Sequence, residues 1–295
     1  MNPQSDENIN KHLGFKSNYL DINGIKYHYV DENPSGSDKV VLLIHGNPTW
    51  SFYFKDMIAA LRETHRVIAV DHIGCGLSDK PQDYDYTLSN HIKNVEHLAK
   101  KLKLKNITLG LHDWGGAIGM GFAVENPDLI DRFIILNTAA FLINRLPLRI
   151  RIFRNPLIGA IGIRLFNLFS YSAIFMACKK HIRMTDALKD GLLAPYDSYK
   201  NRIANLEFVR DIPLTKDDKC YKLVESIERK LHNFRDKKML ILWGEKDFVF
   251  TNLFRDRWKQ YFPKAKVHSF PDAGHYVLVD AGEKIIPLIK KFLAK

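Results

Sequence analysis

Short apolar runs rich in β-branched residues alternate with helix-like stretches near both ends of this 295-residue chain, and this alternation constrains the fold more than any other feature. Helix-like stretches cover residues 88–104 and 115–125. Because nearly uninterrupted apolar strands have to be covered on both faces, the pattern predicts a mostly parallel sheet flanked by helices, with right-handed crossovers. The strand-like runs are residues 25–30, 40–44, 67–70, 107–111, 133–136, 239–243 and 267–270.

Two interruptions of the alternation predict further organisation. The pair Asn23-Gly24 favours a tight two-residue turn, so the sheet should begin with an antiparallel hairpin. From about residue 140 to residue 236 the strand-like runs stop and the sequence becomes helical. We therefore expect one core domain formed by residues 1–139 and 237–295, with residues 140–236 inserted as a helical cap.

The composition limits the class of protein. Hydrophobic residues make up 46% of the chain, which is enough for a compact core and excludes a disordered or collagen-like protein. Cys75, Cys178 and Cys220 are an odd number without CxxC spacing, so we expect neither a disulfide framework nor a structural zinc site. The first 17 residues are polar and lack the apolar stretch of a secretory signal, which favours the cytoplasm.

The net charge of +11 first suggests a nucleic-acid or membrane-surface partner. Nine Lys and Arg residues lie between Arg132 and Thr185, where there is no Asp or Glu, but they are spaced through aliphatic residues and Phe. This spacing argues against nucleic acid and favours a basic, apolar subregion that could meet a membrane surface or a pathway enzyme. Arg164 and Asn167 would be costly at a bilayer centre, so we expect no transmembrane helix over residues 155–178.

A strand, a sharp turn and a helix are predicted to meet at the sequence HDWGG, residues 112–116. This order is typical of a nucleophile elbow, in which the nucleophile stands at the tip of a strained turn and small neighbours make room for it. Asp113 occupies the tip. The small residues that such a turn needs are present after the tip, at Gly115 and Gly116. Leu111, two residues before the tip, is large and does not fit the pattern. Taken alone, Asp113 could equally be the cap of the following helix.

An acid and a histidine follow Asp113 in the chain order of an α/β-hydrolase catalytic triad. His275 lies just beyond the last predicted strand, and Asp247 lies beyond the strand before it. Asp247 is preferred as the acid because it sits deeper in its loop, with Glu245 as the alternative. Either carboxylate could instead be a solvated loop residue. Of the twelve histidines, His275 is the one that we predict to be catalytic.

The sequence HGNPTW, residues 45–50, directly follows the strand-like run at residues 40–44. In a fold with a nucleophile elbow, the loop at this place gives one backbone N–H to an oxyanion hole, and the residue after the nucleophile gives a second. Those donors would be Asn47 and Trp114. An HGxP turn alone is common, but in combination with Asp113 and His275 it predicts a site that stabilises a negative charge.

These motifs give the chain a resemblance to the haloalkane dehalogenases, which are α/β-hydrolases with an Asp nucleophile. HGNPTW, DHIGCGLSDKP, HDWGG and DAGHYV follow the pattern of that family. The resemblance implies an α/β-hydrolase fold with a mostly parallel eight-stranded sheet, flanking helices and a helical cap. It also implies that Asp113 is the nucleophile and that the Asn47 amide and the Trp114 indole hold the leaving group. Some members carry the acid after the sixth strand, but LNTAA at residues 136–140 has no carboxylate, which assigns the acid to Asp247.

Two further segments, LNTAAF at residues 136–141 and APYDSYKNRIANLEFVRDIPL at residues 194–214, resemble the branch that contains the β-lactone decarboxylases of bacterial olefin biosynthesis. This resemblance implies a small hydrophobic substrate, a β-lactone that gives a long-chain cis-olefin, with no cofactor and no metal. Haloalkane dehalogenase is the alternative. Epoxide hydrolases carry HGFP and two cap tyrosines, so Asn47 disfavours them. A non-catalytic binder of hydrophobic ligands remains open because fold does not fix function.

Overall fold

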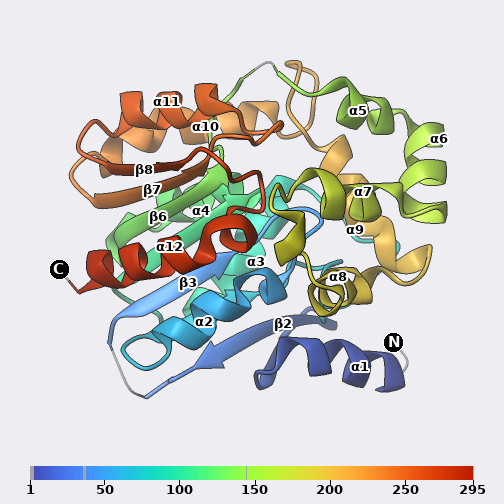
Figure 1. The fold of residues 1–295 in the computed structure, drawn as a ribbon, viewed down its shortest axis with the longest axis horizontal. Coiled ribbons are helices and arrows are strands. Elements are labelled where there is room, and N and C mark those ends of the chain that lie inside the picture. Colours follow the sequence, from blue (N-terminus) through green and yellow to red (C-terminus); the bar gives the residue numbers. More distant parts are fainter. Residues whose placement is uncertain (1–2, 36–37, 144, 295) are drawn as a thin grey trace.

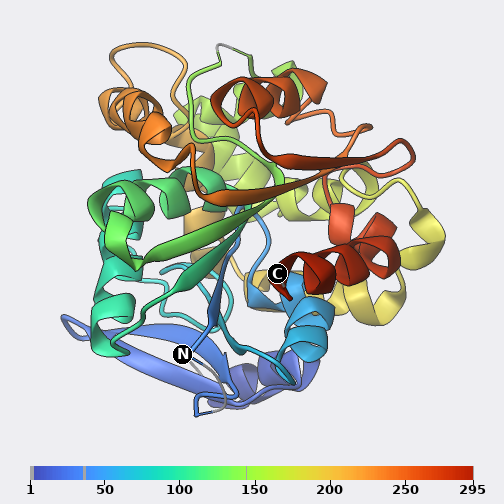
Figure 2. The same cartoon turned by 90° about the vertical axis from the view of Figure 1, so that its left-hand side faces the viewer.

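A single eight-stranded sheet forms the centre of the molecule in the computed structural model, which describes residues 3–35, 38–143 and 145–294 (Figures 1 and 2). The strand order is β1-β2-β4-β3-β5-β6-β7-β8, and all pairs from β4 to β8 are parallel. This confirms the predicted α/β-hydrolase fold. The strands are β1 (Ser17–Ile22), β2 (Ile25–Glu32), β3 (Val40–Ile44), β4 (Arg66–Val70), β5 (Ile107–Asp113), β6 (Ile130–Thr138), β7 (Lys238–Gly244) and β8 (Lys266–Phe270).

The predicted hairpin at the start of the sheet is confirmed. β1 and β2 pair antiparallel, and Asn23 and Gly24 between them have φ angles of 55° and 82°, as a tight hairpin turn requires. Strand β1 itself is absent from the apolar runs of the sequence. It lies at the sheet edge and only Leu20 and Ile22 are buried, so its pattern alternates instead of forming a continuous apolar run.

Helices cover both faces of the sheet. On one face, α3, α4 and α11 pack on the side chains of Leu42, Leu109 and Ile135. On the other face, α2 and α12 pack on Val41 and Leu240. Both layers therefore remove the sheet from water, as the continuous apolar strands predict. The helices flanking the sheet are α1 (Pro3–Leu13), α2 (Lys55–Leu61), α3 (Leu88–Lys101), α4 (Gly115–Glu125), α11 (Asn252–Tyr261) and α12 (Val277–Leu293).

The chain between β6 and β7 contains helices joined by loops, with no strand among its described residues, and α5 to α9 gather on the right of Figure 1, beyond one end of the sheet. The last helix of this segment, α10, packs against α4 of the core. The helices are α5 (Leu148–Arg151), α6 (Pro156–Gly159), α7 (Leu168–Met176), α8 (Asp186–Leu193), α9 (Ile203–Arg210) and α10 (Tyr221–Lys230), with the π-helical turn η4 (Ala160–Leu165) between α6 and α7.

Two of these helical segments are unusually apolar. Over the part of the chain that the structure describes, no single helix has the length and apolar character needed to cross a bilayer. The segments Pro156–Leu165 and Leu168–Met176 reach that apolar character only as a pair, and the pair is bent by 72°.

Candidate active site

Asp113 stands at the tip of a sharp turn between β5 and α4. Its φ of 53° lies in the left-handed region, which Asp and Asn tolerate better than most residues. Neighbouring atoms leave no room for side chains here: a Cβ on Gly46 would lie 2.0 Å from Oδ1 of Asp113, and one on Gly115 would lie 2.0 Å from the backbone carbonyl oxygen of Ile44. The turn therefore has the crowding expected of a nucleophile elbow.

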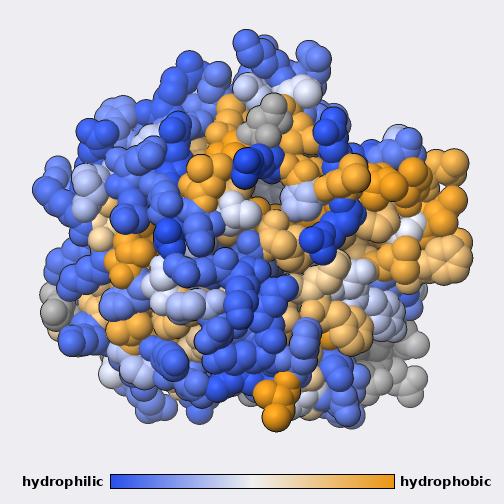
Figure 3. Space-filling model, turned by 45° about the horizontal axis from the view of Figure 1, so that its top comes forward, coloured by the Kyte–Doolittle hydropathy of each residue, from blue (hydrophilic) through white to orange (hydrophobic). Residues whose placement is uncertain are grey.

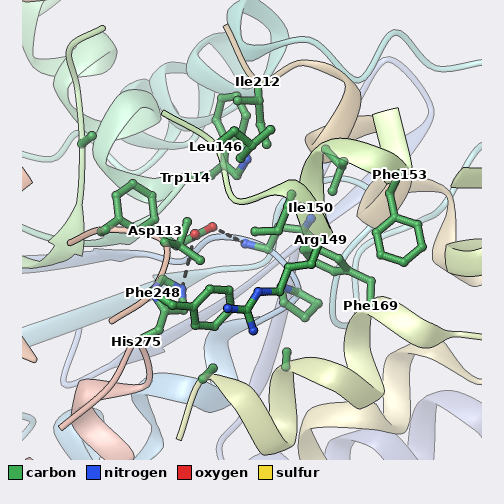
Figure 4. Close-up of a pocket in the computed structure, with 18 of the residues that line it drawn as sticks. Asp113, Trp114, Leu146, Arg149, Ile150, Phe153, Phe169, Ile212, Phe248 and His275 are labelled. Carbon is green, nitrogen blue, oxygen red and sulfur yellow. Dashed lines mark hydrogen bonds and ion pairs between the residues drawn. The ribbon is translucent and has the colours of Figure 1, made fainter. Parts of the chain in front are cut away.

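The Asp113 carboxylate points away from the first turn of α4. Trp114 occupies the N-cap position of α4, and no side chain caps that helix. Oδ1 of Asp113 accepts a hydrogen bond of 2.7 Å from the backbone N–H of Asn47, and Oδ2 lies 3.4 Å from Nε2 of His275 (Figure 4). The carboxylate is thus presented to a cavity and a histidine, as a nucleophile would be.

His275 lies between two carboxylates. Its Nδ1 is 2.8 Å from Oδ2 of Asp247, opposite the contact of Nε2 with Asp113. Asp247 is buried, and its Oδ1 accepts hydrogen bonds from the backbone N–H groups of Val249 and Phe250. The three predicted residues form one continuous chain of contacts, in which Asp247 can fix the orientation of the imidazole ring.

Glu245, the alternative acid, lies elsewhere. Its Oε1 forms an ion pair of 2.6 Å with Arg255, on the helix α11 side of the loop. One residue that the structure adds to the site is Asn137, near the end of β6. Its Nδ2 donates to Oδ2 of Asp247 and to the carbonyl oxygen of Gly244, both at 3.0 Å, and its Oδ1 accepts from the backbone N–H of Gly244 at 2.8 Å.

From the sequence, only a carboxylate was considered at the end of β6, so the amide of Asn137 was not predicted. Asn137 has a φ of 35°, so it also occupies a left-handed backbone position. An asparagine just after a central strand, at the place where some relatives carry an acid, is a signal that could have identified it. By joining β6 to the loop after β7, the amide holds the carboxylate of Asp247 against His275.

The electrostatics of this cluster favour an ion pair. Burial alone would lower the pKa of His275, but the charge of Asp247 and the contact with Asp113 outweigh it and raise the pKa to about 10. For Asp113, burial would raise the pKa, whereas the hydrogen bond and charge of His275 outweigh it and leave the pKa below its usual value. At neutral pH the resting site therefore holds a protonated His275 beside an ionised Asp113.

The predicted anion-stabilising residues are both next to Asp113. The backbone N–H of Asn47 already donates to Asp113, and the Asn47 Nδ2 donates to the carbonyl oxygen of Asn205 at 3.0 Å. A primary amide has two N–H groups, so one remains for a leaving group. Asn205 belongs to α9 and was not singled out from the sequence; its Nδ2 donates to Ser170 of α7, which ties Asn47 to the cap.

A cavity of about 500 Å³ opens above Asp113 and His275. That volume is in the range of pockets that enclose a small organic ligand. The labelled side chains in Figure 4 show Trp114 beside the carboxylate and aromatic rings of the cap around the cavity. Apolar side chains make up most of the lining: Phe141, Ile143, Leu146, Ile150, Phe153, Phe169, Ala173, Met176, Val209, Ile212, Phe248, Val249 and Phe254.

A second buried carboxylate connects the cap to the histidine loop. Asp280, in α12, accepts hydrogen bonds from the backbone N–H of Gly274, the residue before His275. It also accepts from the backbone N–H groups of Lys179 and Lys180 and from the Cys178 thiol, all in the cap. One carboxylate thus fixes both segments.

No group of three or more His, Cys, Asp or Glu residues is arranged to hold a metal ion within the described residues. Cys75, Cys178 and Cys220 are buried and form no disulfide with one another.

The chain matches the alpha/beta hydrolase fold family over residues 39–281. It is 46% identical to a cis-3-alkyl-4-alkyloxetan-2-one decarboxylase of Shewanella oneidensis, over 96% of this chain and 90% of that protein. A protein of the same name from Xanthomonas campestris pv. campestris is 38% identical, over 95% of this chain and 97% of that protein. Among solved structures, the haloalkane dehalogenase DatA from Agrobacterium tumefaciens is similar with a TM-score of 0.83 and 25% identity, covering 95% of this chain and 96% of that one.

Proposed function

Because the chain belongs to the alpha/beta hydrolase fold family, and within it to the branch with the cis-3-alkyl-4-alkyloxetan-2-one decarboxylases, we propose that it converts a β-lactone with two alkyl chains into a cis-alkene and carbon dioxide. The observation that carries this proposal is the cavity: its floor presents one nucleophilic carboxylate with donors beside it, and its walls are apolar. Such a pocket suits a strained ring that bears two hydrocarbon chains.

In the proposed reaction Asp113 is the nucleophile. An oxygen of its carboxylate attacks the saturated ring carbon, the bond from that carbon to the ring oxygen breaks, and an alkyl ester with a free carboxylate results. Next the bond to that carboxylate breaks, its electrons form the carbon–carbon double bond, and Asp113 leaves with its original charge. All atoms of the lactone end in the alkene and carbon dioxide, and no water is consumed.

The ion pair in the resting site supports this route. His275, with a pKa of about 10, remains protonated at neutral pH and keeps Asp113 ionised, which a carboxylate nucleophile requires. Asn47 and Trp114 are proposed to stabilise the carboxylate released from the ring. Asp247 orients His275 and balances its charge. In this proposal residues 140–236 form the cap that closes the apolar walls over residues 1–139 and 237–295.

Haloalkane hydrolysis is the second candidate function, and the pair Asn47 and Trp114 beside Asp113 is the observation that favours it. Here the halide leaves when Asp113 forms its alkyl ester, and His275 must then activate a water molecule against that ester. Esterification removes the negative charge of Asp113, which lowers the pKa of His275. The imidazole can then lose its proton and act as the base. The two reactions therefore differ in their need for His275 as a base.

Epoxide hydrolysis has less support. The tyrosine that lines the cavity among the described residues is Tyr276, which follows His275, whereas the cap tyrosines Tyr171 and Tyr199 are exposed and Tyr196 is buried against Thr49. Tyr221, the fourth tyrosine of residues 140–236, does not line the cavity either, so the described part of the cap presents no pair of phenol groups to Asp113.

The experiment compares three substrates side by side: a cis-3,4-dialkyl β-lactone, 1-bromobutane and a terminal epoxide, each in ¹⁸O-labelled water. We expect alkene and carbon dioxide from the lactone, and no ¹⁸O-labelled β-hydroxy acid, which is the product that addition of water would give. Bromide or diol release without any alkene would overturn the proposal. With His275→Ala, mass spectrometry after exposure to 1-bromobutane should detect an alkyl ester on Asp113 if the dehalogenase route operates. No turnover of any substrate and no adduct would favour a non-catalytic binder.

The proposal extends to partners and location. We propose a cytoplasmic enzyme of olefin biosynthesis whose substrate is a small hydrophobic molecule and whose basic cap meets an anionic surface, either a membrane or another enzyme of the pathway. Arg154 and Arg183 form ion pairs with Asp218 and Glu283, so acidic residues from elsewhere in the fold compensate part of the basic stretch.

A further inference from the structure

Large apolar side chains on the surface are concentrated on the cap. Of the fourteen that are exposed among the described residues, eleven lie between residues 148 and 182. Figure 3 shows a continuous hydrophobic area on its right, over the part of Figure 1 that contains α6 and α7. We call this area the cap patch. Its members are Leu148, Ile152, Leu157, Ile158, Ile161, Leu165, Phe166, Leu168, Tyr171, Phe175 and Ile182.

The helices under the cap patch have a composition that is unusual for a water-facing surface. A helix that is apolar on all sides is expected in a core or in a membrane. Helix α7 has the sequence LFSYSAIFM, yet Tyr171 and Phe175 are 52% and 61% exposed. Asn167, with a φ of 54°, produces the bend between Pro156–Leu165 and Leu168–Met176. The result is a short apolar elbow on the surface, which can enter a bilayer interface but is bent too sharply to span it.

The cap patch is continuous with the active-site cavity. Ile152 and Leu168 line the cavity and are also 48% and 46% exposed. Arg149 lies at the same place: it lines the cavity, its guanidinium lies 4.3 Å from the Phe248 ring centroid, and the residue is exposed. A molecule that leaves the cavity past these residues therefore arrives on the cap patch.

Three exposed positive charges lie in the same stretch of the chain as the patch. Arg145, Arg149 and Arg151 are exposed, and none of the three pairs with a carboxylate within the described ranges of the chain. Residues 132–185 contain no Asp or Glu at all. An apolar surface with a border of unpaired arginines is complementary to a surface that has anionic groups above an apolar interior.

We propose that the cap patch docks on an anionic phospholipid bilayer. Helices α6 and α7 and the turn η4 enter the boundary between headgroups and acyl chains, while Arg145 and Arg151 contact lipid phosphates. The cavity then exchanges its water-insoluble ligand with the bilayer and not with the aqueous phase. Only the identity of that ligand rests on the proposed function; docking itself rests on the exposed residues.

The test is flotation of the full chain with vesicles, without substrate. Vesicles of phosphatidylcholine with about one third phosphatidylglycerol are compared with pure phosphatidylcholine at about 0.05 M and 0.5 M NaCl. We expect binding to the anionic vesicles at low salt and at least about fivefold weaker binding at high salt, because salt screens the arginines. Arg151→Glu should weaken binding, and the fluorescence of F166W should shift to the blue and be quenched by brominated lipid.

Two matched Leu→Gln variants separate the cap patch from general surface hydrophobicity. Leu157 is 69% exposed on the cap patch, and Leu253 is 47% exposed on α11, outside it. Leu157→Gln should reduce vesicle binding at least about fivefold, because the leucine side chain would no longer be transferred out of water on docking. Leu253→Gln should leave binding unchanged. Neither residue lines the cavity, so both variants should turn over a short, water-soluble substrate at the parental rate.

Absence of vesicle binding at low salt would overturn the proposal, as would equal weakening by both Leu→Gln variants. Sedimentation of a dimer that Leu157→Gln dissociates, without vesicle binding, would instead identify a second copy of the chain as the occupant of the cap patch and would also overturn it. Because no substrate is present, a failure of this test leaves the reaction assignment unaffected. Conversely, absence of alkene with retained vesicle binding would remove the proposed reaction alone.

Discussion

Asn137, near the end of β6, donates a hydrogen bond of 3.0 Å to Asp247, in the loop after β7, and it does so at the same carboxylate oxygen that contacts His275. The acid is thus held from two sides, by the amide of β6 and by the backbone N–H groups of its own loop. The end of β6 therefore contributes to this site even though it carries no charge.

We expect Asn137→Ala to lower kcat/KM by about 5- to 150-fold, because the loss of a buried hydrogen bond to a charged group costs about 1–3 kcal/mol. The matched control is Asn90→Ala, which removes an exposed side chain that bonds to Asp85 at the start of α3. The control should retain full activity. Steady-state kinetics of both variants provide the check, and wild-type activity in Asn137→Ala would refute the positioning role.

Asp113→Asn should abolish turnover and preserve the fold. The amide is not a nucleophile, but Asn tolerates the φ of 53° at this position as Asp does. Activity is measured in freshly purified protein, since deamidation would regenerate Asp, and folding is checked by a cooperative thermal transition. If more than about a tenth of the activity remained, a loss of only about 1.4 kcal/mol in transition-state stabilisation, Asp113 would not be the nucleophile.

Asp247→Asn should reduce the rate by about two to four orders of magnitude, because an amide favours the wrong tautomer of His275 and cannot balance its charge. Glu245→Gln is the control. It removes only the ion pair with Arg255 at the edge of the site and should change the rate less than about threefold. The opposite order of the two effects would transfer the role of the acid to Glu245.

Alkene formation should vary little between about pH 6 and pH 9. The pKa of Asp113 is lowered and that of His275 is raised to about 10, so both groups keep their charges across this interval. The initial rate of alkene release, followed by gas chromatography at each pH, tests this. A steep rise of the rate with pH would show that a neutral His275 acts as a base in the limiting step and would contradict the route without water.

Acid should destabilise the fold through His91. Burial lowers the pKa of His91 to about 3, and neither of its ring nitrogens meets a hydrogen-bond partner among the described residues. The unfolded chain binds a proton below about pH 6.5 and the folded chain does not, so this contribution to stability is complete above that pH and is lost as the pH falls toward 3. At pH 5 one such histidine costs about 2 kcal/mol.

His91→Phe should reduce this acid loss, because a phenyl ring can keep the stack on Phe208 without titrating. His97→Gln, on the exposed face of the same helix, is the control and should leave the acid sensitivity unchanged. Denaturant unfolding at pH 5 and pH 8 measures the difference. Identical pH dependence in the parent and in His91→Phe would assign the acid sensitivity to other groups.

The sheet could be predicted because its central strands are apolar on both faces. Such strands appear in the sequence as continuous runs of apolar residues. The edge strand β1 and the polar helix α1 have no such run and were missed for that reason. Asp113, His275 and Asp247 could be located since each follows a recognisable strand. Asn137, Asn205 and Asp280 could not. Each acts on a partner that is at least 101 positions away in the chain, and only the folded structure brings these partners together.

The carboxylate of Asp280 also limits how the active site can open. It bonds to Gly274 and to three donors at residues 178–180, and the backbone N–H of Tyr276 donates to the carbonyl oxygen of Ala177. If the whole cap rotated, these hydrogen bonds would break together and His275 would move away from Asp113. Residues 177–180 are therefore held against the core by hydrogen bonds to Asp280 and Tyr276. Movement that admits a ligand therefore has to leave residues 177–180 in place.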